Sequence, residues 1–209
     1  MENATVTSTP VIACGVATRP LAGQAVCGDL HVIKSFTGGV LMAALDGIGH
    51  GEEAAAAARA ALAILENHAE ESPVLLVRRC HVALKTSRGV VMTIAALNPT
   101  AGALAWLGVG NVAAVLLRAE ATTRPTSEHV VLRSGLVGYA LPELRISTTH
   151  LTPGDLLVFA TNGVYAGFHQ GWVRSDPPQQ IADRIMERYF KGTDDALVLV
   201  ARYLGVRRE

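Results

Sequence analysis

The chain has 209 residues, of which 50% are hydrophobic and 17% are charged, and its 18 Lys and Arg balance its 18 Asp and Glu. This is a globular composition, and a length typical of one domain, which we expect to span residues 1–209. A chain with zero net charge lacks the excess of basic residues found in proteins that bind nucleic acid or anionic membranes, so we expect neither as a partner.

The cysteines and the N-terminus bear on the cellular compartment. Cys14, Cys27 and Cys80 are odd in number and fit neither a zinc spacing nor a disulfide framework, so we interpret them as buried, reduced thiols. The first ten residues, MENATVTSTP, lack the basic start and apolar run of a signal peptide. No apolar stretch approaches the roughly 18 residues of a membrane helix. The sequence therefore predicts a cytoplasmic protein.

The first half of the chain predicts three strands and then two helices. The strands are expected at residues 11–16, 31–36 and 39–45. The first helix, 51–68, is alanine-rich and opens with Glu52 and Glu53, which suit the positive end of a helix dipole. The second helix, about 72–85, has Ser72 as its N-cap and Pro73 at its first helical position.

The second half is rich in predicted strands separated by turn signals. These strands are expected at residues 90–97, 103–108, 112–117, 130–132, 145–149, 156–160 and 196–203, with a third helix at about 178–190. Many short strands joined by hairpins, with few helices, favour an α+β fold over a parallel βαβ sheet. We expect two antiparallel sheets packed face to face with the helices outside.

The segment LMAALDGIGHG, residues 41–51, is the most informative part of the chain. A buried strand ends at Asp46, and glycines in the turn after it allow close backbone approach. A carboxylate at the end of an apolar strand is costly to bury unless a partner such as Mg²⁺ or Mn²⁺ compensates it. The alternative is that Asp46 merely caps the following helix, and this segment alone leaves both interpretations open.

Two other acidic positions lie in similar contexts. Asp29 precedes the strand at 31–36, and Asp194 and Asp195 directly precede the last strand. Adjacent acids repel each other unless a cation lies near. Taken singly, each position is better explained as a polar turn.

The full set of motifs occurs in order over nearly the whole chain and resembles a known family. The motifs are Gly28-Asp29, Asp46-Gly47-Ile48-Gly49-His50-Gly51, Thr161-Asn162-Gly163 and Asp194-Asp195. They are similar to those of the metal-dependent protein phosphatases of the 2C type, in the small SpoIIE-like bacterial branch. The resemblance implies a four-layer αββα sandwich and a protein serine/threonine phosphatase with two Mn²⁺ or Mg²⁺ ions.

The resemblance also implies roles for individual residues. Asp46 would bridge both ions, the Gly47 carbonyl would ligate one, and Asp29 and Asp194 would hold the second ion or orient its waters. Asp195 is a weaker candidate for a ligand, because the family usually needs the first acid of this pair. Arg19 is a candidate phosphate-binding residue. A water activated by the ions would attack phosphorus directly, and Asp46 and Asp29 would be the catalytic residues.

Asn162 departs from the family pattern, which has an aspartate at this position. An amide oxygen still binds a hard cation but brings no negative charge, so one ion is expected to bind weakly. Two interpretations stay open: a natural variant with a weaker site, or an introduced substitution that inactivates the enzyme.

The resemblance points to phosphorylated STAS-domain proteins of a stressosome as partners. Two rival functions are a pseudophosphatase that binds a phosphoprotein without turnover, supported by Asn162, and a hydrolase of small phosphoesters.

Overall fold

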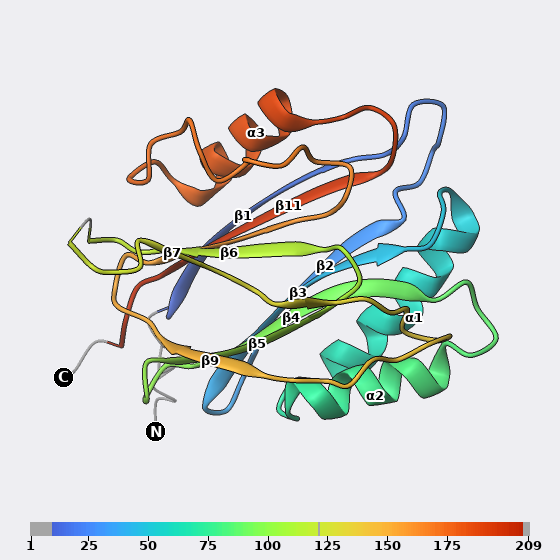
Figure 1. Ribbon diagram of the computed structural model, residues 1–209, viewed down its shortest axis with the longest axis horizontal. Helices are drawn as coiled ribbons and strands as arrows, with labels where there is room; N and C mark the ends of the chain where they lie inside the picture. The colour runs from blue at the N-terminus through green and yellow to red at the C-terminus, as the bar shows by residue number, and fades with distance from the viewer. Residues whose placement is uncertain (1–9, 121, 207–209) are drawn as a thin grey trace, which may run out of the picture.

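The computed structural model describes residues 10–120 and 122–206. The prediction that a signal peptide is absent rests on the N-terminal residues, of which 1–9 lie outside the described residues. The described residues form two β-sheets with helices on their outer faces (Figure 1). The strands are β1 (Ile12–Arg19), β2 (Asp29–Phe36), β3 (Gly39–Gly47), β4 (Val90–Asn98), β5 (Ala103–Val109), β6 (Ala113–Leu117), β7 (Ser127–His129), β8 (Leu132–Arg133), β9 (Ser147–His150), β10 (Leu156–Ala160) and β11 (Ala196–Tyr203). The helices are α1 (Glu52–Asn67), α2 (Pro73–Ala83) and α3 (Pro178–Tyr189).

One sheet has the strand order β1-β11-β10-β6-β7, and the other has the order β2-β3-β4-β5-β8, with β9 also paired to β5. All pairings are antiparallel except that of β5 with β8. We call the first of these sheets the β11 sheet and the second the β3 sheet. The predicted α+β class with two mainly antiparallel sheets is confirmed.

Alternation of side chains along the central strands builds three apolar layers. In β3, Met42 and Ala44 face the β11 sheet, while Leu41 and Leu45 pack against α1 and α2. In β11, the odd-numbered Leu197 faces the β3 sheet, and its even-numbered neighbours pack against α3. Because every central strand is covered on both faces, it reads as a continuous apolar run.

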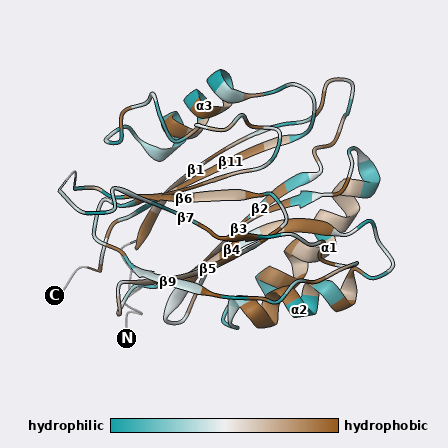
Figure 2. Cartoon of the chain, in the orientation of Figure 1, coloured by the Kyte–Doolittle hydropathy of each residue, from teal (hydrophilic) through white to brown (hydrophobic). Residues whose placement is uncertain are grey.

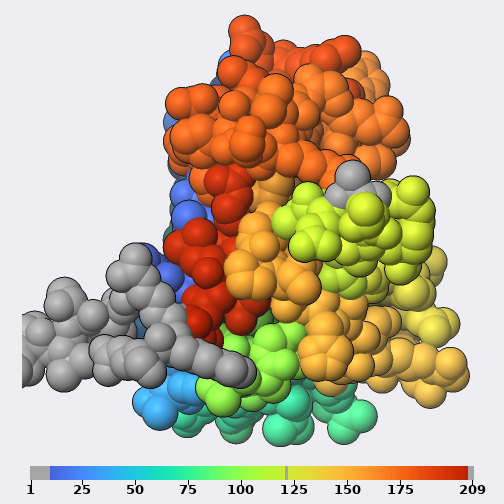
Figure 3. Space-filling model, turned by 90° about the vertical axis from the view of Figure 1, so that its left-hand side faces the viewer, coloured from blue at the N-terminus to red at the C-terminus, as the bar shows by residue number. Residues whose placement is uncertain are grey.

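The layers therefore run α3, β11 sheet, β3 sheet, and then α1 with α2. Figure 3 shows this order from one end of the molecule, with α3 uppermost and the paired helices below. Figure 2 shows the hydrophobic residues concentrated on the strands and on parts of the helices. In the described part of the chain, no helix is both long and apolar enough to cross a bilayer.

All the predicted elements but one are present, and that one, a strand, was predicted wrongly. Ser72 caps α2 as predicted, because its hydroxyl accepts a hydrogen bond from the Leu75 amide at 3.4 Å. The strand predicted at 130–132 is instead a crossing between sheets: β7 ends at His129 and pairs with β6, whereas β8 begins at Leu132 and pairs with β5. The strand predicted at 145–149 begins two residues later than expected, at Ser147.

Candidate active site

Four polar residues lie at one end of the sandwich, where β3 and β10 end and β2 and β11 begin; this end is on the right of Figure 1. Each continues the inward-facing alternation of its strand beyond the apolar core, by one step in β3, β10 and β11 and by two steps in β2. They are Asp29, Asp46, Thr161 and Asp195, all less than 7% exposed. The strand pattern therefore brings three carboxyl groups and one hydroxyl to the same end of the core.

Asp29 and Asp46 are direct partners in the antiparallel register of β2 and β3. Burial, and then the charge of Asp46, raises the pKa of Asp29 to about 8. Burial, and then the charges of Asp194 and Asp195, raises the pKa of Asp46 to about 7. Two acids in this environment repel each other when ionised, so the site stabilises any cation that enters it.

Thr161 orients Asp29. Its hydroxyl oxygen accepts a hydrogen bond from the Leu197 amide at 2.8 Å and donates its proton to Asp29 Oδ2 at 2.7 Å. Donation to a carboxylate favours the charged form, so this contact opposes the upward shift in the pKa of Asp29. The sequence analysis missed this role, although a threonine buried directly after the apolar strand β10 is a signal for it.

Asp195 is held by the backbone of the segment that leads to Asp29. Its Oδ1 accepts the Leu21 amide and its Oδ2 accepts the Gly28 amide, each at 2.7 Å. These contacts join the loop between β1 and β2 to the start of β11. Both oxygens of this carboxylate are thus engaged by the protein itself.

Asp194 and Asn162 lie beside this group. Asp194 is half-buried, and its Oδ1 accepts the backbone amide of Asp195 at 2.9 Å. The side-chain Oδ1 of Asn162 is buried without a hydrogen-bond partner, which is costly for a carbonyl oxygen. Lys191 fixes the backbone of this turn by donating from Nζ to the Asn162 carbonyl at 2.6 Å.

Close backbone packing leaves no room for side chains at two glycines of the site. A Cβ on Gly47 would lie 2.1 Å from the carbonyl oxygen of Ala54 in α1. A Cβ on Gly163 would lie 2.0 Å from the carbonyl oxygen of Asp195. These contacts hold the turn after Asp46 and the turn after Asn162 against the neighbouring elements.

The donor set suits a hard divalent cation. Among the described residues, no three His, Cys, Asp or Glu side chains form a ready-made metal-binding group. The oxygens at this end are of mixed kinds, however: two repelling carboxylates, the unpartnered Asn162 amide oxygen and the Gly47 carbonyl, which lies near Gly28. Carboxylate, amide and carbonyl oxygens are the ligands that Mg²⁺ and Mn²⁺ take in proteins.

Other candidates from the sequence lie elsewhere or are unreactive. The guanidinium of Arg19 lies 5.4 Å from the ring centre of Phe190, on the α3 side of the β11 sheet. His50 is exposed in the turn before α1. Cys27 and Cys14 are half-buried rather than buried, and Cys80 is buried. Burial raises the pKa of the Cys27 thiol to about 12, so little thiolate nucleophile forms near neutral pH.

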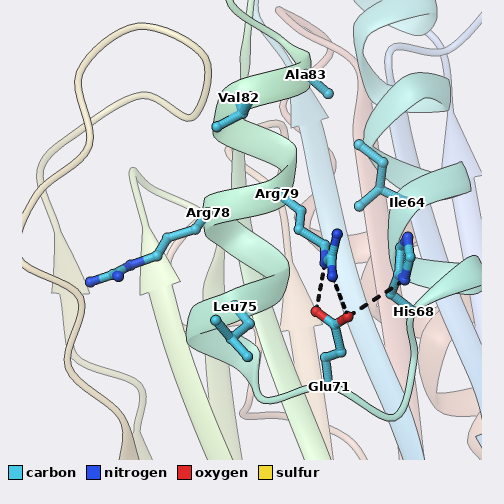
Figure 4. A pocket seen from close by; sticks show the side chains of 8 residues that line it. All are labelled: Ile64, His68, Glu71, Leu75, Arg78, Arg79, Val82 and Ala83. Carbon is cyan, nitrogen blue, oxygen red and sulfur yellow. Dashed lines mark hydrogen bonds and ion pairs between the residues drawn. The ribbon is translucent and has the colours of Figure 1, made fainter.

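A groove of about 500 Å³ between α1 and α2 is a separate feature (Figure 4). Its carboxylate, Glu71, accepts two hydrogen bonds from Arg79, at 2.6 and 2.7 Å, and lies 3.6 Å from His68. Leu75 and Val82 give the groove exposed apolar walls. This groove lacks the repelling acids that distinguish the end of the sandwich.

Comparison with known sequences gives two matches. The model of the family "Stage II sporulation protein E (SpoIIE)" matches residues 37–204. The phosphoserine phosphatase RsbX of Bacillus subtilis (strain 168) is 31% identical over 94 residues, which cover 45% of this chain and 47% of that protein. The alignment thus spans about half the length of that relative.

Solved structures share the fold over nearly the whole chain. One, described as "The bacterial stressosome: a modular system that has been adapted to control secondary messenger signaling", has a TM-score of 0.83, 28% identity and coverage of 91% of this chain and 99% of its own. RsbX in complex with magnesium has a TM-score of 0.78, 22% identity and coverage of 92% and 95%. The phosphatase PstP with two manganese ions has a TM-score of 0.67, 14% identity and coverage of 93% and 99%.

Proposed function

Because this chain belongs to the Stage II sporulation protein E (SpoIIE) family, we propose that it is a metal-dependent phosphatase of phosphoserine and phosphothreonine in proteins. The observation that carries the proposal is the buried pair Asp29 and Asp46, whose mutual repulsion a cation would relieve. We assign the phosphatase domain to residues 1–209.

The proposed ligands are oxygens at the end of the two sheets. Mn²⁺ or Mg²⁺ would be held by Asp29, Asp46, the Gly47 carbonyl, Asp194 and Asn162. Bound there, two ions would lower the pKa of a water and neutralise charge on the phosphoryl group. Asp195 serves in this proposal mainly through its backbone contacts, because both of its oxygens already accept amide protons.

The chain's own residues would keep the acids in the required geometry. Thr161 directs one oxygen of Asp29 and leaves the other free. Asp195 holds the amides of Leu21 and Gly28, so the segment before Asp29 is fixed without a disulfide or an inserted loop. Lys191 fixes the turn that carries Asn162.

We further propose that the substrates are phosphorylated STAS-domain proteins of a stressosome, in the cytoplasm. The support is the likeness to RsbX, a phosphoserine phosphatase, and to a structure described under the bacterial stressosome. A rival function is a pseudophosphatase that binds such proteins without turnover. The neutral Asn162 favours this rival, because a missing carboxylate weakens attraction for a cation in a partly dehydrated site.

One assay separates these functions. The purified chain is given a phosphorylated STAS-domain protein, an unrelated phosphopeptide or p-nitrophenyl phosphate, each with Mn²⁺ or with excess EDTA. We expect Mn²⁺-dependent phosphate release that is fastest from the STAS-domain protein. Tight binding without release would support the pseudophosphatase, equal rates on both phosphorylated polypeptides would contradict a dedicated partner, and full activity in EDTA would exclude the metal mechanism.

A further inference from the structure

A second cavity lies on the α3 side of the β11 sheet, behind the turn that carries Asn162. It measures about 490 Å³, within the usual range of about 300–1,000 Å³ for sites of small ligands. Its walls come from β6, β7, the end of β10 and the segment after it; the lining includes Asn111, Val115, His129, Asn162, Phe168 and Lys191. Thr161 and Asn162 form a wall of this cavity, while the Thr161 hydroxyl donates to Asp29.

The polar groups of this cavity suit an anion. No Asp or Glu lines it in the part of the chain that the structure describes, whereas Lys191, His129 and His169 do. The Lys191 ammonium has three N–H donors and uses one on the Asn162 carbonyl, and its nitrogen lies 5.6 Å from the centre of the Tyr165 ring, so a ligand anion would bind beside that ring. Burial, and then the neighbouring His129 and Arg174, lower the pKa of His169, which favours its neutral form, so Lys191 supplies the positive charge of the lining.

The rest of the cavity suits an apolar body of about the size of a ring. Val115, Val164 and Phe168 are buried core residues that also line it. The imidazoles of His129 and His169 meet edge to face, with centroids 5.4 Å apart. Pockets with apolar walls and a few convergent polar groups are the usual form of a small-molecule site.

We propose that this cavity binds a small organic anion, a carboxylate or phosphate carried on an apolar ring, with Lys191 and His129 as its polar contacts. The cavity adjoins the acidic end of the sandwich, and the two share the wall of Thr161 and Asn162.

The test uses the full chain freed of metal on a chelating resin, so that neither turnover nor binding at the acidic end contributes. The probe is phenylphosphonate, and binding is followed by calorimetry and by amide chemical shifts. We expect saturable binding with a dissociation constant of about 1 mM or tighter. The shifts should gather at residues 111–115, 129, 161–169 and 191. Benzyl alcohol, the neutral ring, should bind at least about tenfold more weakly, a difference of about 1.4 kcal/mol.

Variants identify the contacts. Lys191→Met and His129→Gln should each weaken binding of phenylphosphonate at least about threefold, whereas Lys191→Arg should restore most of the affinity. Lys85→Met is the matched control, because Lys85 is exposed beyond the end of α2, and it should leave binding unchanged. His129 lies on β7, outside the Asn162 turn, so its variant tests the site even if Lys191→Met disturbs that turn. Shifts centred elsewhere, or an affinity in both variants equal to that of the parent, would overturn the proposal.

Discussion

Asp29 and Asp46 stand opposite each other on β2 and β3, and the hydroxyl of Thr161 donates to Asp29 at 2.7 Å. One acid of the pair is therefore oriented by a neutral group, and within the described residues neither acid contacts a cationic side chain. Such an arrangement is costly in the protein alone, because buried carboxylates repel each other. It becomes favourable when a divalent cation binds, and the predictions below follow from this difference.

Replacing Asp46 with asparagine tests the proposed bridging ligand. Asp46→Asn should abolish Mn²⁺ binding and lower kcat by more than tenfold, which is more than about 1.4 kcal/mol in barrier height. Without metal, the variant should be at least as stable to heat as the parent, since one repelling charge is gone. Glu187→Gln, on the exposed face of α3, is the matched control. Retention of more than a tenth of kcat would mean that Asp46 does not bridge two ions.

Restoring the carboxylate at position 162 tests the family alignment. Asn162→Asp adds a negative charge at nearly constant shape, so it should tighten Mn²⁺ binding and raise the rate at limiting Mn²⁺, with a smaller effect at saturation. Calorimetric titration with Mn²⁺ measures the first effect. Asn67→Asp, on the exposed end of α1, controls for charge added elsewhere. Coincident isotherms would place Asn162 outside the metal site.

The metal-free protein should become less stable as pH rises, which is the opposite of the usual effect of carboxyl groups. The folded pKa values of Asp29, about 8, and Asp46, about 7, lie above the ordinary value of 3.8. The folded state therefore keeps protons that the unfolded chain releases, so this contribution is present at low pH and is lost as pH rises from about 4 to about 8. Thermal unfolding in chelator should show a Tm that falls over this range.

Two comparisons test whether these acids cause the fall in Tm. Asp29→Asn should flatten the fall in Tm with pH, and saturating Mn²⁺ should offset it at the upper end of the range. A Tm that falls equally steeply in the parent and in Asp29→Asn would show that Asp29 keeps no proton in the folded state.

Asp194 and Asp195 should differ when each is replaced by asparagine. In Asp195→Asn, an amide nitrogen faces a backbone N–H, and an unmade buried hydrogen bond costs about 1–3 kcal/mol. The amide protons of Leu21 and Gly28 should then exchange faster with solvent. Asp194→Asn should leave these protons protected and weaken Mn²⁺ binding instead. If both variants gave the same exchange pattern, the division of roles between the two acids would be wrong.

The regular elements were predictable where apolar runs end at clear signals. The bounds of β10 and β11 match the predicted 156–160 and 196–203, because Pro153-Gly154-Asp155 and Asp194-Asp195 delimit these runs. The crossing at Val130 was not predictable, since the apolar run 130–132 has the pattern of a strand although it leads from β7 in one sheet to β8 in the other.

The acidic residues of the site could be predicted from the sequence, but their arrangement in space could not. The order Asp29, Asp46 and Asp194 along the chain pointed to metal chemistry, and the structure gathers these residues at one end of the sandwich. The hydrogen bonds of Asp195 with Leu21 and Gly28, and that of Thr161 with Asp29, join residues more than 130 positions apart in sequence. Such contacts depend on how the sheets stack, which the local pattern does not encode.

The place of β11 between β1 and β10 has a consequence for synthesis on the ribosome. Of the described strands, β1 is translated before all the others, whereas its neighbour β11 is translated after all the others. Until then, the β11 sheet lacks the strand that joins its two halves, and the loop before Asp29 lacks the carboxylate of Asp195. A nascent chain therefore assembles the acidic end only when translation of β11 is complete, and no earlier fragment of this chain has the arrangement described above.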